Sequence, residues 1–353
     1  MSAYSRANSS EDNIALSLRR FLRLLLLRDK PTRQEIAKSG GFSPASVTIS
    51  SKWLTEHEFL RKVSERTSNS KRPVERLNLR CLPLSVLAVR LSSLEVASDL
   101  LDSTGTILSS QKRDILNATQ AQIFKALGEE ILVAQARADE LGKPMLSIVL
   151  SVDGQVSHPD AGMIFNLNGL EDWQPCAPKA IHPIMSGFHP VTHWTQAVCK
   201  LHGLARRLQT DDHVAYFDVR PRDLHFAMMH NGVVTQGEIG TSGNFLHQTV
   251  QAKGPACFCG RPGCLDALLR AGEATPEMVF GAIQRLIEKE RIQHVGIEWK
   301  SVPADVEHAI QETLQRSLVM VNDGREIEFQ GLSLLGVETT LLHRINALQS
   351  MNG

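Results

Sequence analysis

Three cysteines and one histidine lie close together in the second half of the sequence. His247 is followed by Cys257, Cys259 and Cys264. Thiolate and imidazole groups are ligands that zinc prefers, and four of them complete a tetrahedral coordination sphere. The pattern predicts a structural zinc, because four protein ligands leave no open position for a reactive water. The alternative is a group of buried, reduced cysteines beside an unrelated histidine.

Two glycines lie among these cysteines. Gly260 and Gly263 permit the tight backbone reversals that would turn the neighbouring thiols toward one point. The other three cysteines are isolated in the sequence, and we expect them to be buried as small apolar side chains. They are Cys81, Cys176 and Cys199.

Motifs of common enzymes are missing. The sequence contains neither a G-x-x-x-x-G-K-[ST] phosphate loop nor a G-x-G-x-x-G segment that opens a helix. No Ser-His-Asp or Cys-His arrangement stands out. We therefore expect no catalytic residues and no enzymatic activity.

The N-terminal part has the pattern of a helix-turn-helix. Residues 14–28 have the apolar spacing of an amphipathic helix. Thr32 can cap a short second helix, which ends at Gly40 and Gly41. Ser43 can cap a third helix, with Pro44 at its first position. A short helix, a glycine turn and a second capped helix is the geometry that lays the latter in the major groove of DNA.

The third helix would present its polar face to DNA. Val47, Ser50 and Leu54 fall on one side and should pack inward. The outward face has no Arg, Asn or Gln for bidentate base contacts, so we expect methyl contacts and DNA shape to matter. The predicted contacts on and before this helix are Ser43, Ala45, Ser46, Thr48, Ile49 and Lys52.

A basic tip follows between two short strands. Lys71 and Arg72 precede the alternating segment 74–79. Two strands around this tip would make a wing, with both cations placed for DNA phosphate or the minor groove. The alternative is a plain surface hairpin.

The charge distribution supports this division. Residues 1–80 carry 16 Lys and Arg against 8 Asp and Glu, and the remaining residues carry 22 against 30. The basic part is the candidate for binding a polyanion, unless it is only a well-solvated module. No run approaches the ~20 apolar residues of a membrane helix, and the first dozen residues lack an apolar signal core. We therefore expect a soluble cytoplasmic chain with no membrane partner.

The rest of the chain has an α/β pattern. Its 353 residues exceed the roughly 250–300 that one hydrophobic core supports, so several domains are expected. A hairpin over residues 86–108, a helix near 117–141 and a strand at Met145–Val152 come first. Further strand signals at 213–219 and 224–229 suggest that this plan repeats.

Two segments carry a resemblance to a known family. Residues 237–247 read GEIGTSGNFLH, and residues 257–266 read CFCGRPGCLD. Together with the helix-turn-helix, they resemble the ROK family of repressors and sugar kinases, over nearly the whole chain. The resemblance implies a winged helix joined to a duplicated actin-like (ribonuclease H-like) ATPase-type α/β body. It also implies that the histidine and three cysteines described above hold zinc.

The resemblance implies three domains. Residues 1–80 would form a winged helix-turn-helix DNA-binding domain. Residues 81–190 together with 337–353 would form a first α/β lobe. Residues 191–336 would form a second lobe that carries the zinc motif.

Departures from the family pattern argue against a kinase. The first phosphate motif of the family kinases is replaced by residues 90–94 (RLSSL), and their second phosphate loop by residues 223–227 (DLHFA). Their late glycine pair corresponds to Gly296 followed by isoleucine. Their Asn-Asp pair, with the catalytic base, aligns with His193 and Trp194, and an indole cannot accept a proton at neutral pH. We therefore expect no bound ATP, and an active sugar kinase is only a remote alternative.

The family's sugar pocket is also altered, which leaves two interpretations of the body. It binds a sugar or a related small effector, or the larger side chains fill the cavity and the body only forms oligomers or binds a protein partner. The candidate effector residues are Asn166, Asn168, His193, Trp194, Asn244, His247 and Asp266.

Taken together, the sequence predicts a transcriptional regulator. We expect a repressor of carbohydrate-related genes that binds a double-stranded DNA operator as a homodimer or homotetramer. Effector binding would favour an arrangement of the two winged helices that no longer fits the spacing of the operator half-sites.

Overall fold

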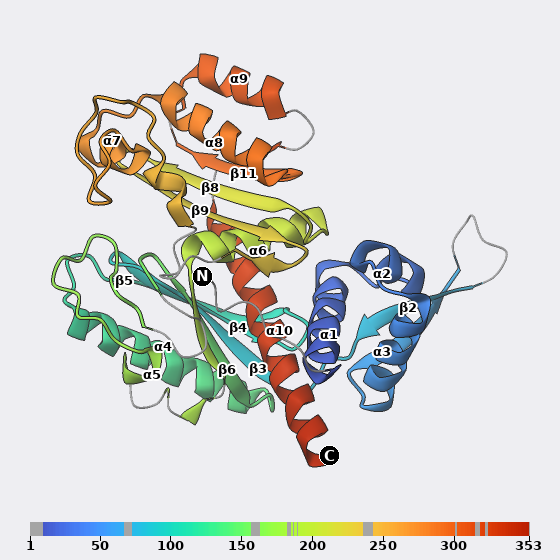
Figure 1. The fold of residues 1–353 in the computed structure, drawn as a ribbon. Coiled ribbons are helices and arrows are strands. Elements are labelled where there is room, and N and C mark those ends of the chain that lie inside the picture. The colour runs from blue at the N-terminus through green and yellow to red at the C-terminus, as the bar shows by residue number, and fades with distance from the viewer. Residues whose placement is uncertain are drawn as a thin grey trace.

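The computed structural model describes most of residues 10–352. The described ranges are 10–66, 73–156, 163–181, 185, 187–188, 190–235, 243–300, 302–314, 318–321 and 324–352. They form a small N-terminal unit and a body with two five-stranded sheets (Figure 1). None of the described helices is both long enough and apolar enough to span a membrane.

The N-terminal unit consists of three helices followed by an antiparallel hairpin. Thr32 and Glu35 form a reciprocal capping box at the start of the second helix, and Gly41 ends it with a φ of 63°. The Ser43 side chain accepts a hydrogen bond from the Ser46 amide at 3.1 Å and caps the third helix. These caps confirm the predicted elements. The elements are α1 (Ser10–Leu27), α2 (Arg33–Gly40), α3 (Pro44–Glu56), β1 (Leu60–Glu65) and β2 (Val74–Leu79).

The prediction that Ser50 packs inward from α3 is wrong. Val47 and Leu54 are buried as expected, but Ser51 is buried in place of the half-buried Ser50. Ser51 lies four residues after Val47 and three before Leu54, so all three share one side of the helix. Its hydroxyl donates to the Thr48 carbonyl oxygen at 3.1 Å, which satisfies its hydrogen-bonding need.

The first sheet of the body has the strand order β5-β4-β3-β6-β7. β3, β4 and β5 are antiparallel neighbours, whereas β6 and β7 continue the sheet parallel to β3. α4 packs against it, and Thr119 caps that helix. The elements of this lobe are β3 (Ser85–Leu91), β4 (Glu95–Asp102), β5 (Ile107–Asp114), α4 (Gln120–Glu140), β6 (Met145–Val152), α5 (Pro178–Ile181) and β7 (Val191–Thr195).

The second sheet repeats this plan with the order β10-β9-β8-β11-β12. Again three antiparallel strands are followed by two parallel ones, which confirms the predicted repeat. Helices α7, α8 and α9 lie on one side of this sheet in Figure 1. The elements are β8 (Val214–Arg220), β9 (Asp223–His230), β10 (Val233–Val234), the 3-10 helix η2 (Gly243–His247), α7 (Leu265–Ala271), α8 (Pro276–Glu290), β11 (His294–Trp299), α9 (Ala304–Leu314) and β12 (Leu318–Met320).

Two helices pack together at the centre of the body. They are α6 (Gln196–Leu208) and α10 (Gly324–Asn352) (Figure 1). A Cβ atom on Gly203 would lie 1.8 Å from the Ile327 carbonyl oxygen, and one on Gly331 would lie 1.7 Å from the Cys199 carbonyl oxygen. Only glycine therefore allows the two backbones to approach this closely.

The predicted boundaries between the lobes differ from the observed elements. We assigned the chain from residue 191 onward to the second lobe, yet β7 pairs with β6 in the first sheet. Its hydrogen bonds place it in the first lobe. α10 also runs without interruption through the predicted boundary after residue 336. A short buried strand and a long helix give no composition change that marks such boundaries in the sequence.

The N-terminal unit is fixed to the body through α1. Leu22 belongs to the same hydrophobic core as Leu341 and Ile345 of α10. Arg23 donates from Nη2 to a Glu338 carboxylate oxygen at 2.8 Å, and Arg19 donates from Nε to the other oxygen at 3.1 Å. The Arg23–Glu338 pair is buried, and it fixes the position of α1 on α10.

Candidate functional site

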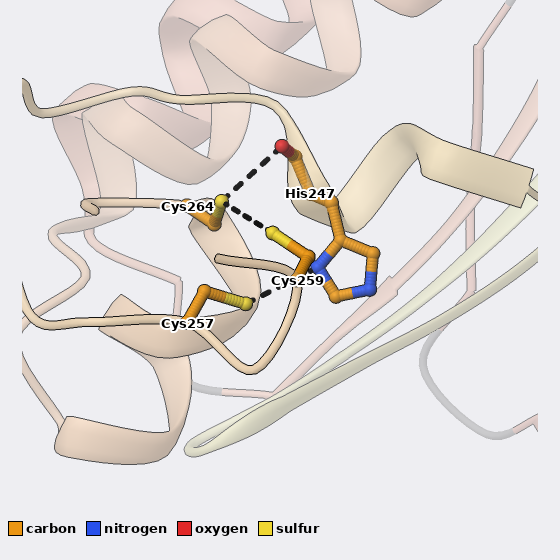
Figure 2. A group of neighbouring side chains, drawn as sticks. All are labelled: His247, Cys257, Cys259 and Cys264. Atoms are coloured by element: carbon orange, nitrogen blue, oxygen red, sulfur yellow. Dashed lines mark hydrogen bonds between the residues drawn. The ribbon is translucent and has the colours of Figure 1, made fainter. Parts of the chain in front are cut away.

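The predicted metal ligands converge in the structure. His247 comes from the end of η2, Cys264 immediately precedes α7, and Cys257 and Cys259 lie on the loop between them (Figure 2). The four ligand atoms all lie within 4.8 Å of one another. His247 Nδ1 is 3.3 Å from Cys257 Sγ, and the Sγ atoms of Cys259 and Cys264 are 3.5 Å apart.

These distances fit a tetrahedral zinc. A zinc ion about 2.3 Å from each sulfur holds the sulfurs about 3.8 Å apart. The donor set of three thiols and one imidazole is also one that zinc prefers. The geometry is therefore compatible with the structural ion that the sequence predicts.

Glycines shape the loop as expected. Gly260 has a φ of 85° and donates to the Cys257 carbonyl oxygen at 2.9 Å. Gly263 has a φ of 61°, and a Cβ atom there would lie 1.6 Å from the Gln251 carbonyl oxygen. No other residue fits at Gly263, and the reversal there turns Cys264 toward the cluster.

The surroundings of the cluster set its electrostatics. A hydrogen bond from the Arg261 backbone lowers the pKa of Cys259 to about 7, whereas burial raises the pKa of Cys264 to about 11. Asp266 has a carboxylate oxygen 3.5 Å from Cys257 Sγ and also pairs with Arg270. Such a carboxylate beside the ligands is well placed to orient them.

The isolated cysteines differ from our expectation. Cys199 is buried, but Cys176 is half-buried and Cys81 is exposed. Cys81 lies near Lys143, at an Sγ to Nζ distance of 3.7 Å, in the segment that joins the N-terminal unit to the body. The isolation of a cysteine in the sequence did not determine its burial.

The predicted DNA-binding residues on α3 share an accessible face. Ala45, Thr48, Ile49 and Lys52 are exposed, and 69% of the Ile49 surface is open to solvent. Ser43 is exposed and Ser46 half-buried. The predicted wing strands are present as β1 and β2, and they pair antiparallel from end to end. Lys71 and Arg72 lie outside the described residues.

Several polar groups on this face are already used by the helix. The Ser43 and Ser46 hydroxyls are hydrogen-bonded to each other at 2.8 Å. Thr48 donates its hydroxyl to the Pro44 carbonyl oxygen at 2.8 Å, and Lys52 lies 3.7 Å from Glu56. The face therefore offers mainly methyl groups and one lysine.

The candidate effector residues do not form one group. Asn166 accepts a hydrogen bond from the Gln155 amide at 2.7 Å. Asn168 donates to Asp153 at 3.0 Å and lies 3.4 Å from His225 of β9. Asp266 lies beside the metal ligands, as described above, together with His247. The side chain of Asn244 lies outside the described part of the structure.

His193 and Trp194 are both buried in β7. Trp194 is 8% exposed and belongs to the hydrophobic core that also contains Val198 and Leu201 of α6. Its ring lies edge-on to His202, with ring centroids 6.2 Å apart. Burial and the nearby charges of α1 arginines keep the pKa of His202 well below its usual value. Trp194 therefore contributes to packing at this position.

A network of charged side chains between the lobes was not predicted. Arg220, at the end of β8, reaches Asp153 of the first lobe at 3.1 Å, Asp218 at 3.0 Å and Gln196 at 2.7 Å. Asp218 and Asp153 raise the pKa of the guanidinium far above its usual value, against the effect of burial. Arg220 thus bridges the two sheets. We refer to this set, with Lys200, Glu298 and Glu328, as the interlobe network.

Lys200 and Glu328 occupy the buried part of the interlobe network. Lys200 Nζ donates to Asp218 at 2.8 Å and to Glu298 at 2.6 Å. Glu328 accepts from the Ser151 hydroxyl at 2.6 Å and from Gln196 at 3.0 Å. Burial raises the pKa of Glu328 to about 7. The sequence offered no signal for this network because its members come from separate elements.

The segments compared with kinase motifs take up ordinary positions in the sheets. Arg90 at the end of β3 forms a buried ion pair with Glu95. Residues 223–227 lie within β9, so the β8–β9 turn is formed by residues 221–222 and not by the segment that we aligned with a phosphate loop. Gly296 lies in the middle of β11, where a Cβ atom would meet Leu204 at 2.7 Å.

Comparison with known proteins agrees with the resemblance seen in the sequence. Residues 224–323 match the model of the ROK family. The DNA-binding transcriptional dual regulator NagC of Escherichia coli K12 is 22% identical over 265 residues, and an N-acetylglucosamine repressor of Shigella flexneri shows the same identity. These matches cover 72% of this chain but only 62% of the relatives, which is less than two thirds of their length.

Solved structures show the same fold. A ROK family transcriptional regulator, described as a homologue of the E. coli MLC protein, matches with a TM-score of 0.66 and 17% identity over 94% of this chain and 98% of its own. A ROK hexokinase from Thermus thermophilus matches with a TM-score of 0.55 and 19% identity over 76% of this chain and its whole length. The body therefore has the actin-like α/β fold of ROK proteins. Residues 224–323 thus match the ROK family, and the chain is similar to transcriptional regulators of that family in sequence and fold.

Proposed function

We propose that this chain is a DNA-binding transcriptional regulator in which a winged helix reads DNA and the kinase-like body responds to an effector. The observation that carries the proposal is the exposed face of α3. Ile49 is 69% exposed on this short, capped helix, and its aliphatic side chain suits contact with thymine methyl groups in the major groove. Relatives that are named as transcriptional regulators support the same function.

The order of the elements in the N-terminal unit supports this proposal. α2, the Gly41 turn and α3 follow each other as in a helix-turn-helix, and the β1–β2 hairpin stands where a wing is expected. In Figure 1, α1 lies between α10 and the pair α2 and α3. α3 is thus carried on the side away from the body. Lys71 and Arg72 stay predictions for contacts with phosphate or the minor groove.

We further propose that the body has no kinase activity. Arg220 and Lys200 pair with carboxylates of the chain between the lobes, so the protein itself balances these charges. Trp194, at the position that we aligned with the catalytic base, is packed in the core and cannot accept a proton. Structural relatives that are named as kinases share the fold only.

The remaining parts of the proposal concern ligands and assembly. We propose that the Cys and His cluster holds a structural zinc and that the regulator is a repressor of carbohydrate-related genes, acting as a homodimer or homotetramer. A sugar-like effector is favoured by the names of the N-acetylglucosamine repressors among the relatives. A body that serves only for assembly or protein contact is the second candidate, favoured by the burial of Trp194.

A mobility-shift assay tests the DNA-binding surface. With DNA from the chain's own promoter region, Ile49→Glu should weaken binding at least tenfold, about 1.4 kcal/mol, because the new carboxylate would face the phosphate backbone. Leu132→Glu is the matched control, since Leu132 is an exposed leucine on α4 of the body. Its affinity should equal that of the unmodified chain. If Ile49→Glu binds as tightly as the control, α3 is not the DNA-reading helix.

A further inference from the structure

A separate cavity lies where the N-terminal unit meets the body. Its volume is about 360 Å³. One wall comes from the end of α1, the turn after it and β2; the other comes from Thr104 in the β4–β5 turn and from Arg206 and Gln209 at the end of α6. A volume of this size suits a small metabolite. The cavity is distinct from the region between the lobes.

Two arginines in this cavity lack a carboxylate partner. Arg28 and Arg206 are both half-buried, and no carboxylate oxygen in the described part of the chain lies within 4.0 Å of either guanidinium. Among the described residues, Arg28 Nε is buried without a hydrogen-bond partner. The Arg206 side chain donates to the Ser333 hydroxyl at 3.4 Å, toward a neighbouring cavity of about 830 Å³ that Arg206 also lines. Burial lowers the pKa of Arg206. Partly buried cations are normally paired, so these two are unusual.

Other charged side chains near the cavity do not neutralise Arg28 and Arg206. Lys30 also lines the cavity, and its Nζ lies 3.5 Å from a carboxylate oxygen of Glu65. Asp29 lines it as well but is exposed. Glu35 lies near Arg28, but its hydrogen bonds with Thr32 in the capping box of α2 are the main cause of its lowered pKa. The balance of charge in the cavity stays positive.

We propose that this cavity binds a small metabolite that carries an oxyanion, either a phosphate ester or a carboxylate. A guanidinium matches both groups with paired N–H donors, and such charge-assisted hydrogen bonds are among the strongest in proteins. Arg28 belongs to the N-terminal unit and Arg206 to the body, so one bound anion would connect the two. The side-chain amides of Asn78 and Gln209 also line the cavity and can bind other polar groups of the ligand.

A phosphate of the DNA backbone is a less suitable occupant. The cavity lies between α1 and the body, whereas α3 is on the other side of α1 (Figure 1). DNA on α3 would therefore meet the opposite side of the N-terminal unit.

Titration calorimetry on the full chain without DNA tests the proposal. Inorganic phosphate and malonate serve as separate probes, at constant ionic strength maintained with sodium chloride. At least one of them should bind saturably, and the stronger of the two identifies the oxyanion. Arg28→Gln and Arg206→Gln should each weaken binding about tenfold or more. Arg206→Lys keeps the charge but loses the paired donors, so it should give an intermediate loss even if Arg206→Gln is poorly folded.

Arg207→Gln is the matched control. Arg207 is the next residue of α6, is exposed and does not line this cavity, so its loss should leave anion affinity unchanged. The proposal is overturned if neither anion binds above the chloride background, or if all three Gln variants weaken binding equally. It is also overturned if the chain binds no anion while Arg28→Gln and Arg206→Gln lose affinity for DNA. Because the titration contains no DNA, its result is independent of the proposed DNA-binding function.

Discussion

The metal cluster and the interlobe network bring polar groups together in opposite ways. The cluster comes from one stretch of chain, residues 247–264, and turns four metal-binding groups toward one point. The interlobe network takes its members from both lobes and from α6 and α10, and it pairs Asp153, Asp218 and Glu298 with Arg220 or Lys200. Three thiols and one imidazole that converge on one point indicate a site for an external metal ion. Donors that are already balanced indicate a structural joint.

Removing one cluster ligand should have the largest effect. Cys257→Ser replaces a thiolate that zinc binds strongly with a weak ligand, so we expect the bound zinc to fall from one per chain to near zero. The loop over residues 248–264 has only a small apolar cluster of its own, so the free energy of unfolding should fall by several kcal/mol. Metal analysis of the purified protein and thermal unfolding measure both effects.

The control for this change is Cys81→Ser. Cys81 is exposed and lies outside the cluster, so its variant should keep both the metal content and the stability of the unmodified chain. A Cys257→Ser protein that retains its zinc, or an unmodified protein that contains none after purification in zinc-containing buffer, would show that the cluster is only a group of reduced cysteines.

Removing a cation from the interlobe network should have the next largest effect. Lys200→Met would leave Asp218 and Glu298 buried without their shared partner. Breaking a buried ion pair in this way typically costs about 3–5 kcal/mol. Urea unfolding should therefore show a loss of this size. Lys289→Met is the control, because Lys289 is exposed on α8, and its stability should be within about 0.5 kcal/mol of the unmodified chain. Equal stabilities would show that the network is not a joint.

The same comparison explains what the sequence could and could not predict. Local signals determine the cap at Ser43, the turn at Gly41 and the metal loop, since each depends on residues a few positions apart. The repeat of the two sheets also followed from strand patterns. The interlobe network did not, because Arg220 and Asp153 are 67 residues apart in sequence and meet only when both sheets are complete.

Packing also changed several expectations at single residues. Trp194 was a candidate effector residue, with filling of the cavity as the alternative, and β7 places it in the core beside His202. β7 itself was assigned to the wrong lobe, because five residues of strand look the same in either sheet. The burial of a strand residue and the sheet that a strand joins depend on which face of the strand packs against which helix. The amino-acid composition of the strand does not determine this.

The smallest effect that we predict is a change in pH dependence from Glu328→Gln. Burial raises the folded-state pKa of Glu328 from 4.5 to about 7, with Arg90, Lys200 and Asp153 as the charged neighbours. The folded chain therefore binds more protons than the unfolded chain between pH 4.5 and 7, so stability falls as the pH rises through this window. A glutamine cannot ionise. The stability of the variant relative to the unmodified chain should thus increase by about 2–3 kcal/mol from pH 4.5 to pH 7.

Urea unfolding at several pH values measures this difference, with Glu326→Gln as the control. Glu326 lies on the same helix but is exposed, so the difference between its variant and the unmodified chain should not change with pH. If the prediction holds, Glu328 is the one member of the interlobe network whose burial lowers the stability of the chain near pH 7. This would separate Glu328 from the fully paired members of the network. The difference in stability between Glu328→Gln and the unmodified chain could instead be independent of pH. That result would mean that Arg90 and Lys200 balance the charge of Glu328 completely, and that every carboxylate of the interlobe network is fully paired.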